Sequence, residues 1–258
     1  MENNNVHING NVTLPMSLIH DIFDTYIGTD YKLLIHKEGS SDEDRSRILS
    51  IELIMLSRME EYFKDVLLSD RLKSKLCNEA CKRGYVNTLK WAREYGCEWD
   101  RDTCMAAAWN GHLDCLKYAR EHGCVWDGDT CSAAAENGHL DCLKYAREHG
   151  CEWDSNTCCD AAWNGHLECL KYAREHECEW DSYTCSAAAM NGHLDCLQWA
   201  REHGCEWDSD TCSNAAMNGH LNCLKYAREH GCEWNRFACL SAAVKRGHIE
   251  IVEWIDST

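Results

Sequence analysis

The sequence lacks several features that would assign it to common functional classes. It has no surplus of basic residues, because 26 Lys and Arg stand against 43 Asp and Glu, which gives a net charge of -17. Nucleic acid and anionic membranes would be repelled, whereas a partner protein with a basic surface would be attracted. No apolar run is long enough to span a bilayer, and the Asn-rich start lacks a basic-then-apolar signal pattern. We therefore expect the reducing cytoplasm or nucleus, in this cell or in a host cell.

Patterns typical of catalysis and metal binding are missing as well. No nucleophile–base arrangement and no Gly-rich phosphate loop is visible, so we predict neither an enzyme nor a cofactor. His139 and Cys142 form an H-x-x-C pattern that recurs along the chain, and His149 and Cys151 form H-x-C, but no C-x-x-C pair exists. Structural zinc sites need convergent ligands at other spacings. We predict no metal site, and a metal-binding Cys/His array is kept as an alternative.

Cysteine is absent from the first 76 residues and abundant afterwards. All twenty cysteines lie between Cys77 and Cys239, and they recur at fixed positions beside small apolar residues. Such a number would indicate a disulfide scaffold in a short secreted chain. Without a secretion signal, we interpret them as reduced thiols that act as small buried apolar groups.

A repeat of 27 residues organises most of the chain. Glycines recur at this spacing at positions 84, 111, 138, 165, 192 and 219, and Gly247 follows after 28. The unit Cys124–Gly150 reads CVWDGDTCSAAAENGHLDCLKYAREHG, and nearly the same text recurs in seven copies, of which the first and last are degraded. Fixed periods of this length are typical of solenoids.

Each unit predicts two short helices. Asp127 is expected to cap the first helix, which would run over residues 128–137 and end at Gly138. The second helix would run over residues 140–149 and end at Gly150. The tryptophan that precedes each cap is expected to pack between units. Seven such helix pairs make an all-α array.

The copies differ mainly on one side of the first helix. Cys131, Ala134 and Ala135 barely change and form a packed stripe, whereas positions 128, 129, 132, 133 and 136 vary and share one sector. The second helix hardly varies, with Leu140, Leu143 and Ala146 as its inner stripe. The variable positions of all units are predicted to align into one partner-binding surface, formed by Arg101, Asp102, Met105, Trp109, Asp129, Ser132, Glu136, Asn156, Cys159, Asp160, Trp163, Tyr183, Ser186, Met190, Asp210, Asn214, Met217, Arg236, Phe237 and Leu240.

Drift at unconstrained solvent positions is the competing explanation of this variation. Drift would supply mainly polar residues, whereas the predicted surface contains Trp, Met, Tyr and Phe. We therefore favour protein binding, and a decoy or purely structural array stays open as an alternative.

The repeat resembles the ankyrin repeat. The resemblance is carried by Thr157, Ala161-Ala162, Asn164-Gly165-His166-Leu167 and Leu170-Lys171-Tyr172. It implies an all-α fold and a protein-binding array without catalysis. Ankyrin units have about 33 residues, and the short link Gly-Cys-Glu-Trp leaves no room for their long hairpin, so binding is expected on the first helices. Cys- and Trp-rich arrays like this resemble those of large amoeba-infecting viruses and some protists, which implies host–virus interaction.

The segment before the repeats has a different pattern. Residues 1–12 are expected to be disordered, residues 13–70 to form a helical domain and residues 71–258 to form the array. Leu14-Pro15 followed by Ile19, Ile22 and Phe23 weakly resembles the opening of an F-box, and residues 54–68 resemble its closing helix. This resemblance implies docking on a Skp1-type adaptor, with the repeats recruiting a substrate to a ubiquitin ligase. A cap that only shields the end of a monomeric solenoid is the alternative.

Overall fold

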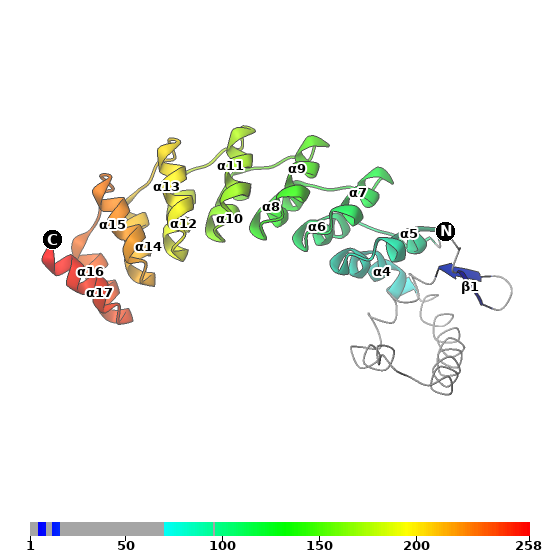
Figure 1. Ribbon diagram of the computed structural model, residues 1–258, viewed down its shortest axis with the longest axis horizontal. Coiled ribbons are helices and arrows are strands. Elements are labelled where there is room, and N and C mark those ends of the chain that lie inside the picture. The colour runs from blue at the N-terminus through cyan, green and yellow to red at the C-terminus, as the bar shows by residue number, and fades with distance from the viewer. Residues whose placement is uncertain (1–4, 9–11, 16–69, 95) are drawn as a thin grey trace, which may run out of the picture. The chain divides into compact units, whose positions relative to one another are not determined.

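The computed structural model describes residues 5–8, 12–15, 70–94 and 96–258, and Figure 1 shows its elements. The chain divides into two compact units, Met1–Trp99 and Asp100–Thr258. The described elements from residue 70 onward are all helices, and the ends of these helices recur with the sequence repeat.

The first unit holds a short hairpin and one helix pair. Strands β1 (Asn5–Ile8) and β2 (Val12–Pro15) pair antiparallel, with Asn5 opposite Pro15 and Ile8 opposite Val12. Helices α4 (Asp70–Arg83) and α5 (Val86–Glu94) form the first repeat.

The hairpin corrects two predictions for the N-terminal segment. The expected disorder over residues 1–12 does not hold for the residues in β1 and β2, where the β-branched residues Val6, Ile8, Val12 and Thr13 favour strands. Leu14 and Pro15, which were expected to open a helix, lie in β2. Ile19, Ile22 and Phe23 lie outside the described residues, as does the rest of the predicted segment 16–69.

The second unit contains six helix pairs in two layers. In chain order these are α6 (Arg101–Trp109), α7 (Leu113–Glu121), α8 (Gly128–Glu136), α9 (Leu140–Glu148), α10 (Ser155–Trp163), α11 (Leu167–Glu175), α12 (Ser182–Asn191), α13 (Leu194–Glu202), α14 (Ser209–Asn218), α15 (Leu221–Glu229), α16 (Arg236–Arg246) and α17 (Ile249–Ser257). Each first helix from α6 to α16 packs on the next one, and the second helices α7 to α15 do the same (Figure 1). With α4 and α5, the described residues contain the seven predicted pairs.

The first helices begin at an aspartate, as the sequence predicts. The Asp100 side chain accepts a hydrogen bond from the Thr103 backbone N–H, and the Thr103 side chain accepts one from the Asp100 backbone N–H, which forms a capping box. Asp154, Asp181 and Asp208 also cap through their side chains. Asp127 is the exception: its backbone is extended as at the other caps, but its carboxylate makes no cap hydrogen bond.

The core is built from small residues and cysteine. The predicted stripe of Cys131, Ala134 and Ala135 is fully buried, as are Leu143 and Ala146 on the second helix. All twenty cysteines are buried, as predicted. Tight burial of small side chains explains why the first helices can pack closely in one layer.

The cysteine before each tryptophan also has a polar role that the sequence did not reveal. The Cys124 thiol donates to the Asp100 carbonyl oxygen at 3.1 Å, and the Cys151 thiol donates to the Asp127 carbonyl at 3.1 Å. Cys178, Cys205 and Cys232 repeat this contact. Each thiol therefore ties one unit to the helix cap of the preceding unit.

The Gly-His pair in each turn joins neighbouring units. Gly138 has a φ of 73°, and a Cβ added there would lie 2.5 Å from His166 Nδ1 in the next unit. The same turn at the end of the array brings His248 Nε2 to 3.0 Å from the Met217 carbonyl oxygen, to which the ring N–H donates. Only glycine fits both the backbone angle and the histidine ring.

The repeated tryptophan packs between units, which confirms the prediction. The Arg147 guanidinium of α9 lies 4.3 Å from the Trp153 ring centroid. On its other side Trp153 meets Tyr172 of α11 edge-on, with centroids 6.2 Å apart. The tryptophan is therefore a structural link between successive second helices.

Candidate functional site

Two positions of the first helix reach solvent in successive units, and together they define the first-helix surface. One row of this surface contains Asp102, Asp129, Asn156, Tyr183, Asp210 and Phe237, which are all exposed. The other row contains Trp109, Glu136, Trp163, Met190, Met217 and Val244, which are exposed or half-buried. All twelve side chains come from one helix layer and lie at equivalent positions of successive helices.

Large apolar side chains concentrate on the first-helix surface. Among the described residues, six of the eight exposed large hydrophobic side chains belong to it, the other two being Val125 and Ile249. Phe237 is 79% exposed, Tyr183 51% and Trp109 43%. Exposed aromatic residues gathered on one face are typical of protein-binding surfaces.

The middle of the predicted variable face is not available to a partner. Cys159 and Ser186 are buried, contrary to prediction, because this position faces the next first helix. Cys159 Sγ lies 3.3 Å from Thr184 Oγ1, and Ser132 Oγ lies 3.3 Å from Thr157 Oγ1. Variation at these positions changes packing between units. Met105 and Leu240, at the same position, are half-buried.

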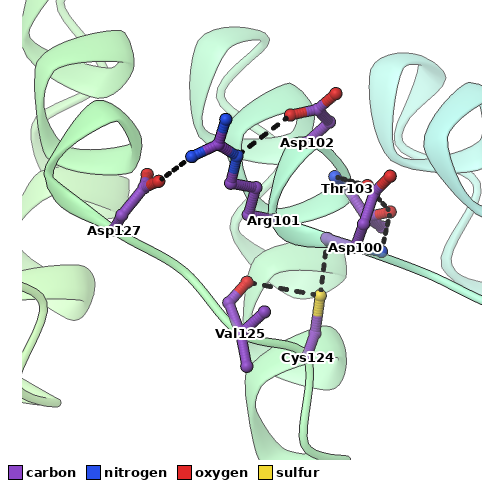
Figure 2. A network of polar contacts seen from close by, with 7 residues as sticks. All are labelled: Asp100, Arg101, Asp102, Thr103, Cys124, Val125 and Asp127. Carbon is purple, nitrogen blue, oxygen red and sulfur yellow. Dashed lines mark hydrogen bonds and ion pairs between the residues drawn. The ribbon is translucent and has the colours of Figure 1, made fainter.

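Arg101 and Asp102 are exposed, but they take part in contacts within the chain (Figure 2). Arg101 Nη1 lies 3.0 Å from Asp127 Oδ2 in the next unit, and Arg101 Nε lies 3.9 Å from Asp102 Oδ1. This explains why Asp127 does not cap its helix. Arg236, also predicted on the surface, donates to the Ile255 carbonyl at 2.7 Å. These two arginines are therefore already engaged in contacts within the chain, which reduces their availability to a partner protein.

Negative charge gathers between α8 and α10. Burial, followed by the charges of Glu136 and Asp154, raises the pKa of Asp160 to about 6, although the Ser132 hydroxyl donates to its carboxylate. Within the described part of the chain, no lysine or arginine lies within ion-pair distance of Glu136 or Asp160. A pair of carboxylates that no described lysine or arginine neutralises thus borders the first-helix surface.

The thiols are poor candidates for chemistry. Burial raises the pKa of Cys142 to about 12 and that of Cys169 to about 11. A hydrogen bond to Cys151 and burial raise the pKa of Cys131 still further. Nucleophilic attack and metal binding require the thiolate, so Cys131, Cys142 and Cys169 are poorly suited to either. The hydrogen bond from Cys131 lowers the pKa of Cys151, its partner thiol. Among residues 70–94 and 96–258, no three His, Cys, Asp or Glu side chains converge as a metal site.

The second-helix layer presents a constant surface. The Lys144 ammonium lies 5.7 Å from the Tyr172 ring centroid in the next unit. In the following unit Lys171 pairs with Glu168 at 2.8 Å. Within the described parts, no helix is long and apolar enough to cross a membrane.

Comparisons with known proteins agree with this geometry. Family models described as ankyrin repeats match residues 131–174 and 185–256. The crystal structure of the human ASB11 ankyrin repeat domain superposes with a TM-score of 0.53 and 18% identity, over 61% of this chain and 84% of that chain. No curated protein matches the sequence.

Residues 131–174 and 185–256 therefore match ankyrin repeats, as the sequence resemblance predicts, and the array has the fold of a helical-repeat solenoid. Ankyrin repeats generally mediate protein–protein interaction, and ankyrin-repeat proteins are typically binding modules without enzymatic activity.

Proposed function

We propose that this chain is a protein-binding module that captures its partner with the first-helix surface. The observation that carries the proposal is the set of exposed Trp, Tyr, Met and Phe side chains in the two rows of varying positions on one helix layer. Substitutions at solvent-exposed positions change stability little. Random drift would therefore have left mainly polar residues at these positions. Aromatic anchors at regular intervals suit a partner that contacts several repeats at once.

The charge of the chain narrows the kind of partner. The net charge of -17 and the acidic site between α8 and α10 favour a protein with a basic surface. Because each repeat unit contacts its neighbours within the same chain, we propose that the protein binds its partner as a monomer. The buried cysteines support a reducing compartment as the place of action.

Affinity capture with paired variants tests the proposal. We expect Trp163→Ala combined with Tyr183→Ala to lose proteins that the wild-type chain retains from a eukaryotic lysate. The matched control is Glu148→Ala combined with Glu202→Ala, which removes exposed side chains from the second-helix layer. Loss with the control alone, or equal retention by both variants, contradicts binding by the first helices. Thermal unfolding of each variant checks that the fold is intact.

We further propose that residues 13–70 dock on a Skp1-type adaptor, which would make the chain a substrate receptor of a ubiquitin ligase. The support is the sequence of the segment, in particular Ile19, Ile22 and Phe23. Purified adaptor should bind the full chain and should not bind a variant with these residues changed to Ala. Absence of binding to the wild-type chain contradicts the adaptor role and leaves a capped binding solenoid.

A further inference from the structure

The histidines of the Gly-His turns have one ring nitrogen at a carbonyl oxygen and the other at a glycine. His248 Nε2 lies 3.0 Å from the Met217 carbonyl oxygen, so Nε2 carries the proton of the neutral ring and donates it. His166 donates to the Glu136 carbonyl oxygen in the same way. Its Nδ1 faces Gly138, because a Cβ added there would lie 2.5 Å from that nitrogen. A proton on Nδ1 would therefore point at a glycine carbon, which accepts no hydrogen bond.

Equivalent histidines follow one another along the array, and we call them the histidine column: His139, His166, His193, His220 and His248. All of them are half-buried. Each stands at the N-cap of a second helix, where the helix dipole opposes positive charge. Burial lowers the pKa of His166 and of His220, and the neighbouring members of the column add to this effect. A positive charge is therefore disfavoured on these two rings.

The charged groups around the two rings do not compensate a positive charge. Those that act on each ring are its neighbours in the column, namely His139 and His193 for His166, and His193 and His248 for His220. In the first turn of α11, which His166 begins, Glu168 already pairs with Lys171 at 2.8 Å. The first turn of α15, which His220 begins, has no acidic residue.

The carbonyl oxygens that accept these hydrogen bonds belong to residues of the first-helix surface. They are those of Glu136, Met190 and Met217, which bond the rings of the second helices that follow. These three residues lie in one row of the first-helix surface, in the last turns of α8, α12 and α14. A change in the histidine column therefore acts directly on the helix ends that present this row.

A second set of histidines provides a comparison within the chain. His149 Nδ1 lies 2.8 Å from the Tyr145 carbonyl oxygen, and His203 Nδ1 lies 2.8 Å from that of Trp199. Both histidines are exposed, and their rings pack on those of Tyr145 and Trp199. Because Nδ1 donates here, a proton from solvent binds at Nε2 without breaking either contact. We therefore expect acid to leave these histidines in place.

The backbone of the Gly-His turn does not require histidine. In the first repeat Tyr85 occupies the equivalent position, and its backbone N–H donates to the Ala80 carbonyl oxygen at 2.9 Å. The His166 backbone N–H donates to the Ala161 carbonyl oxygen at 2.8 Å. The same turn therefore forms around a side chain that is not basic, and the histidines bring sensitivity to acid in addition.

We propose that the histidine column is an acid-sensitive switch in the first-helix surface. Below a pH of about 6.5, a proton binds at Nδ1 and displaces the ring from its glycine, and the hydrogen bond from Nε2 to the first-helix carbonyl oxygen is lost with it. The ends of the first helices are then no longer held, and the partner protein is released. This inference rests on the proposed function, since it describes how binding by that surface is regulated.

The lowered pKa of His166 and of His220 sets the direction of the pH effect. The ordinary pKa of histidine is 6.5, so below this pH the unfolded chain takes up protons before the folded chain does. The contribution of these contacts to stability is therefore complete above this pH and decreases as the pH falls below it. Neighbouring charged rings also repel each other, which adds to the loss.

Urea unfolding of the full chain at a pH of about 7.5 and of about 5.5 tests the switch. The wild-type chain should unfold at a lower urea concentration at the acidic pH. His166→Gln combined with His220→Gln keeps an N–H donor at each site but takes up no proton. In this variant the fall in the urea midpoint should be smaller by about a third or more.

The matched control is His149→Gln combined with His203→Gln, which removes two histidines of the comparison set. It should show the same fall in the urea midpoint as the wild-type chain. An unreduced fall in the variant of the histidine column, or an equal reduction in the control, overturns the proposal.

Proton NMR of the wild-type chain follows the titration of each ring directly. The ring Cε1–H signals of His166 and His220 are assigned by their absence in the single variants His166→Gln and His220→Gln. Both signals should titrate with a pKa below the ordinary value of 6.5. A pKa at or above that value for both rings would contradict the acid sensitivity of the histidine column.

Capture from lysate separates failure of this inference from failure of the proposed function. Proteins that the wild-type chain retains at neutral pH should be released by a wash at a pH of about 5.5, and the variant of the histidine column should keep more of them. Equal release from both would show that the column does not regulate binding. If the wild-type chain retains nothing at neutral pH, the proposed function is wrong, whereas unfolding and NMR still decide whether the column responds to acid.

Discussion

The two helix layers of the array have opposite patterns of variation. The second helices are almost copies, since α7 and α9 both read LDCLKYARE and α11 reads LECLKYARE. The first helices α6, α8 and α10 read RDTCMAAAW, GDTCSAAAE and SNTCCDAAW. Their constant residues are buried, and their variable residues lie at the contacts between neighbouring helices or in solvent. Residues buried within a unit are constant, and those at the contacts between neighbouring first helices or in solvent differ.

Contacts across units explain the constancy of the second layer. The Lys117 ammonium lies 5.8 Å from the Tyr145 ring centroid of the next unit, and the Arg120 guanidinium lies 4.3 Å from the Trp126 centroid. Tyr145 also packs on His149, with ring centroids 4.0 Å apart. One substitution in this layer therefore disturbs two units, whereas one on the first-helix surface disturbs none.

The largest expected effect comes from breaking the constant part of the array at a Gly-His turn. Gly138→Ala forces a Cβ against His166 and places alanine at a φ of 73°. We expect a loss of about 3 kcal/mol in the free energy of unfolding, from left-handed strain plus overpacking. Urea unfolding followed by circular dichroism measures it.

The glycine at the end of the second helix is the control. Gly150 has a φ of 81°, but nothing lies within 4 Å of an added Cβ. Glu177 occupies the equivalent position at a φ of 67°, so a side chain is tolerated there. Gly150→Ala should lose only about 1 kcal/mol. Equal losses at Gly138 and Gly150 would mean that the histidine contact contributes nothing.

Changes to the first-helix surface should affect binding and leave stability alone. Trp163→Ala is expected to weaken binding of a captured partner by about 2 kcal/mol, as at interface hot spots. The free energy of unfolding should change by about 0.5 kcal/mol or less. Calorimetric titration and urea unfolding of the same preparation give both values. A large loss of stability with unchanged affinity would place this tryptophan in the scaffold.

Replacing the Asp160 carboxylate, which lies between α8 and α10, should change the stability of the first-helix layer in a way that depends on pH. The pKa of Asp160 is about 6 in the folded chain, above the ordinary aspartate value of 3.8, so the folded state holds the extra proton between these pH values. The carboxylate therefore lowers stability as the pH rises through 6. Asp160→Asn should stabilise the chain by about 1 kcal/mol at neutral pH, after allowance for solvent screening.

The gain from Asp160→Asn should disappear below pH of about 4, where the carboxyl group is protonated in both states. Unfolding of wild type and variant at both pH values measures the difference, and charges elsewhere in the chain cancel. A gain that does not depend on pH would trace to packing rather than to the charge.

The smallest effect is expected at an exposed ion pair between units. Arg101→Ala removes the contacts with Asp127 and Asp102 shown in Figure 2. Exposed pairs of this kind contribute about 0.5 kcal/mol, and salt screens them. Urea unfolding in low and high salt should show a small loss that shrinks with salt. Asp127 is then free to cap α8, which reduces the loss further.

Periodicity alone was enough to predict the repeat architecture. Asp127 and Gly138 flank α8 where expected, although the Asp127 carboxylate makes no cap hydrogen bond, and the end of α9 falls within one residue of the prediction. These elements are predictable because their signals are local: a capping residue, a glycine that accepts a positive φ and an apolar stripe. The burial of the cysteines followed from their fixed places beside alanine.

Contacts between units were harder to predict because the partners stand about a full repeat apart. The thiol of Cys151 donates to Asp127, and Ser132 meets Thr157, although sequence shows only that these residues recur. For the same reason Cys159 was placed on the surface, although it faces the next helix. Variation between the repeat units does not distinguish a solvent-exposed position from a buried position at which two neighbouring helices pack together.

Photo-crosslinking from single positions most directly tests the claim that the first-helix layer binds the partner. The photoreactive residue p-benzoylphenylalanine would replace Tyr183 on α12 or, as the control, Glu175 on α11, both of which are exposed. We predict a discrete crosslinked species in eukaryotic lysate from position 183 and none from position 175. Crosslinking from 175 alone, or equally from both positions, would contradict the division into a constant scaffold and a binding surface.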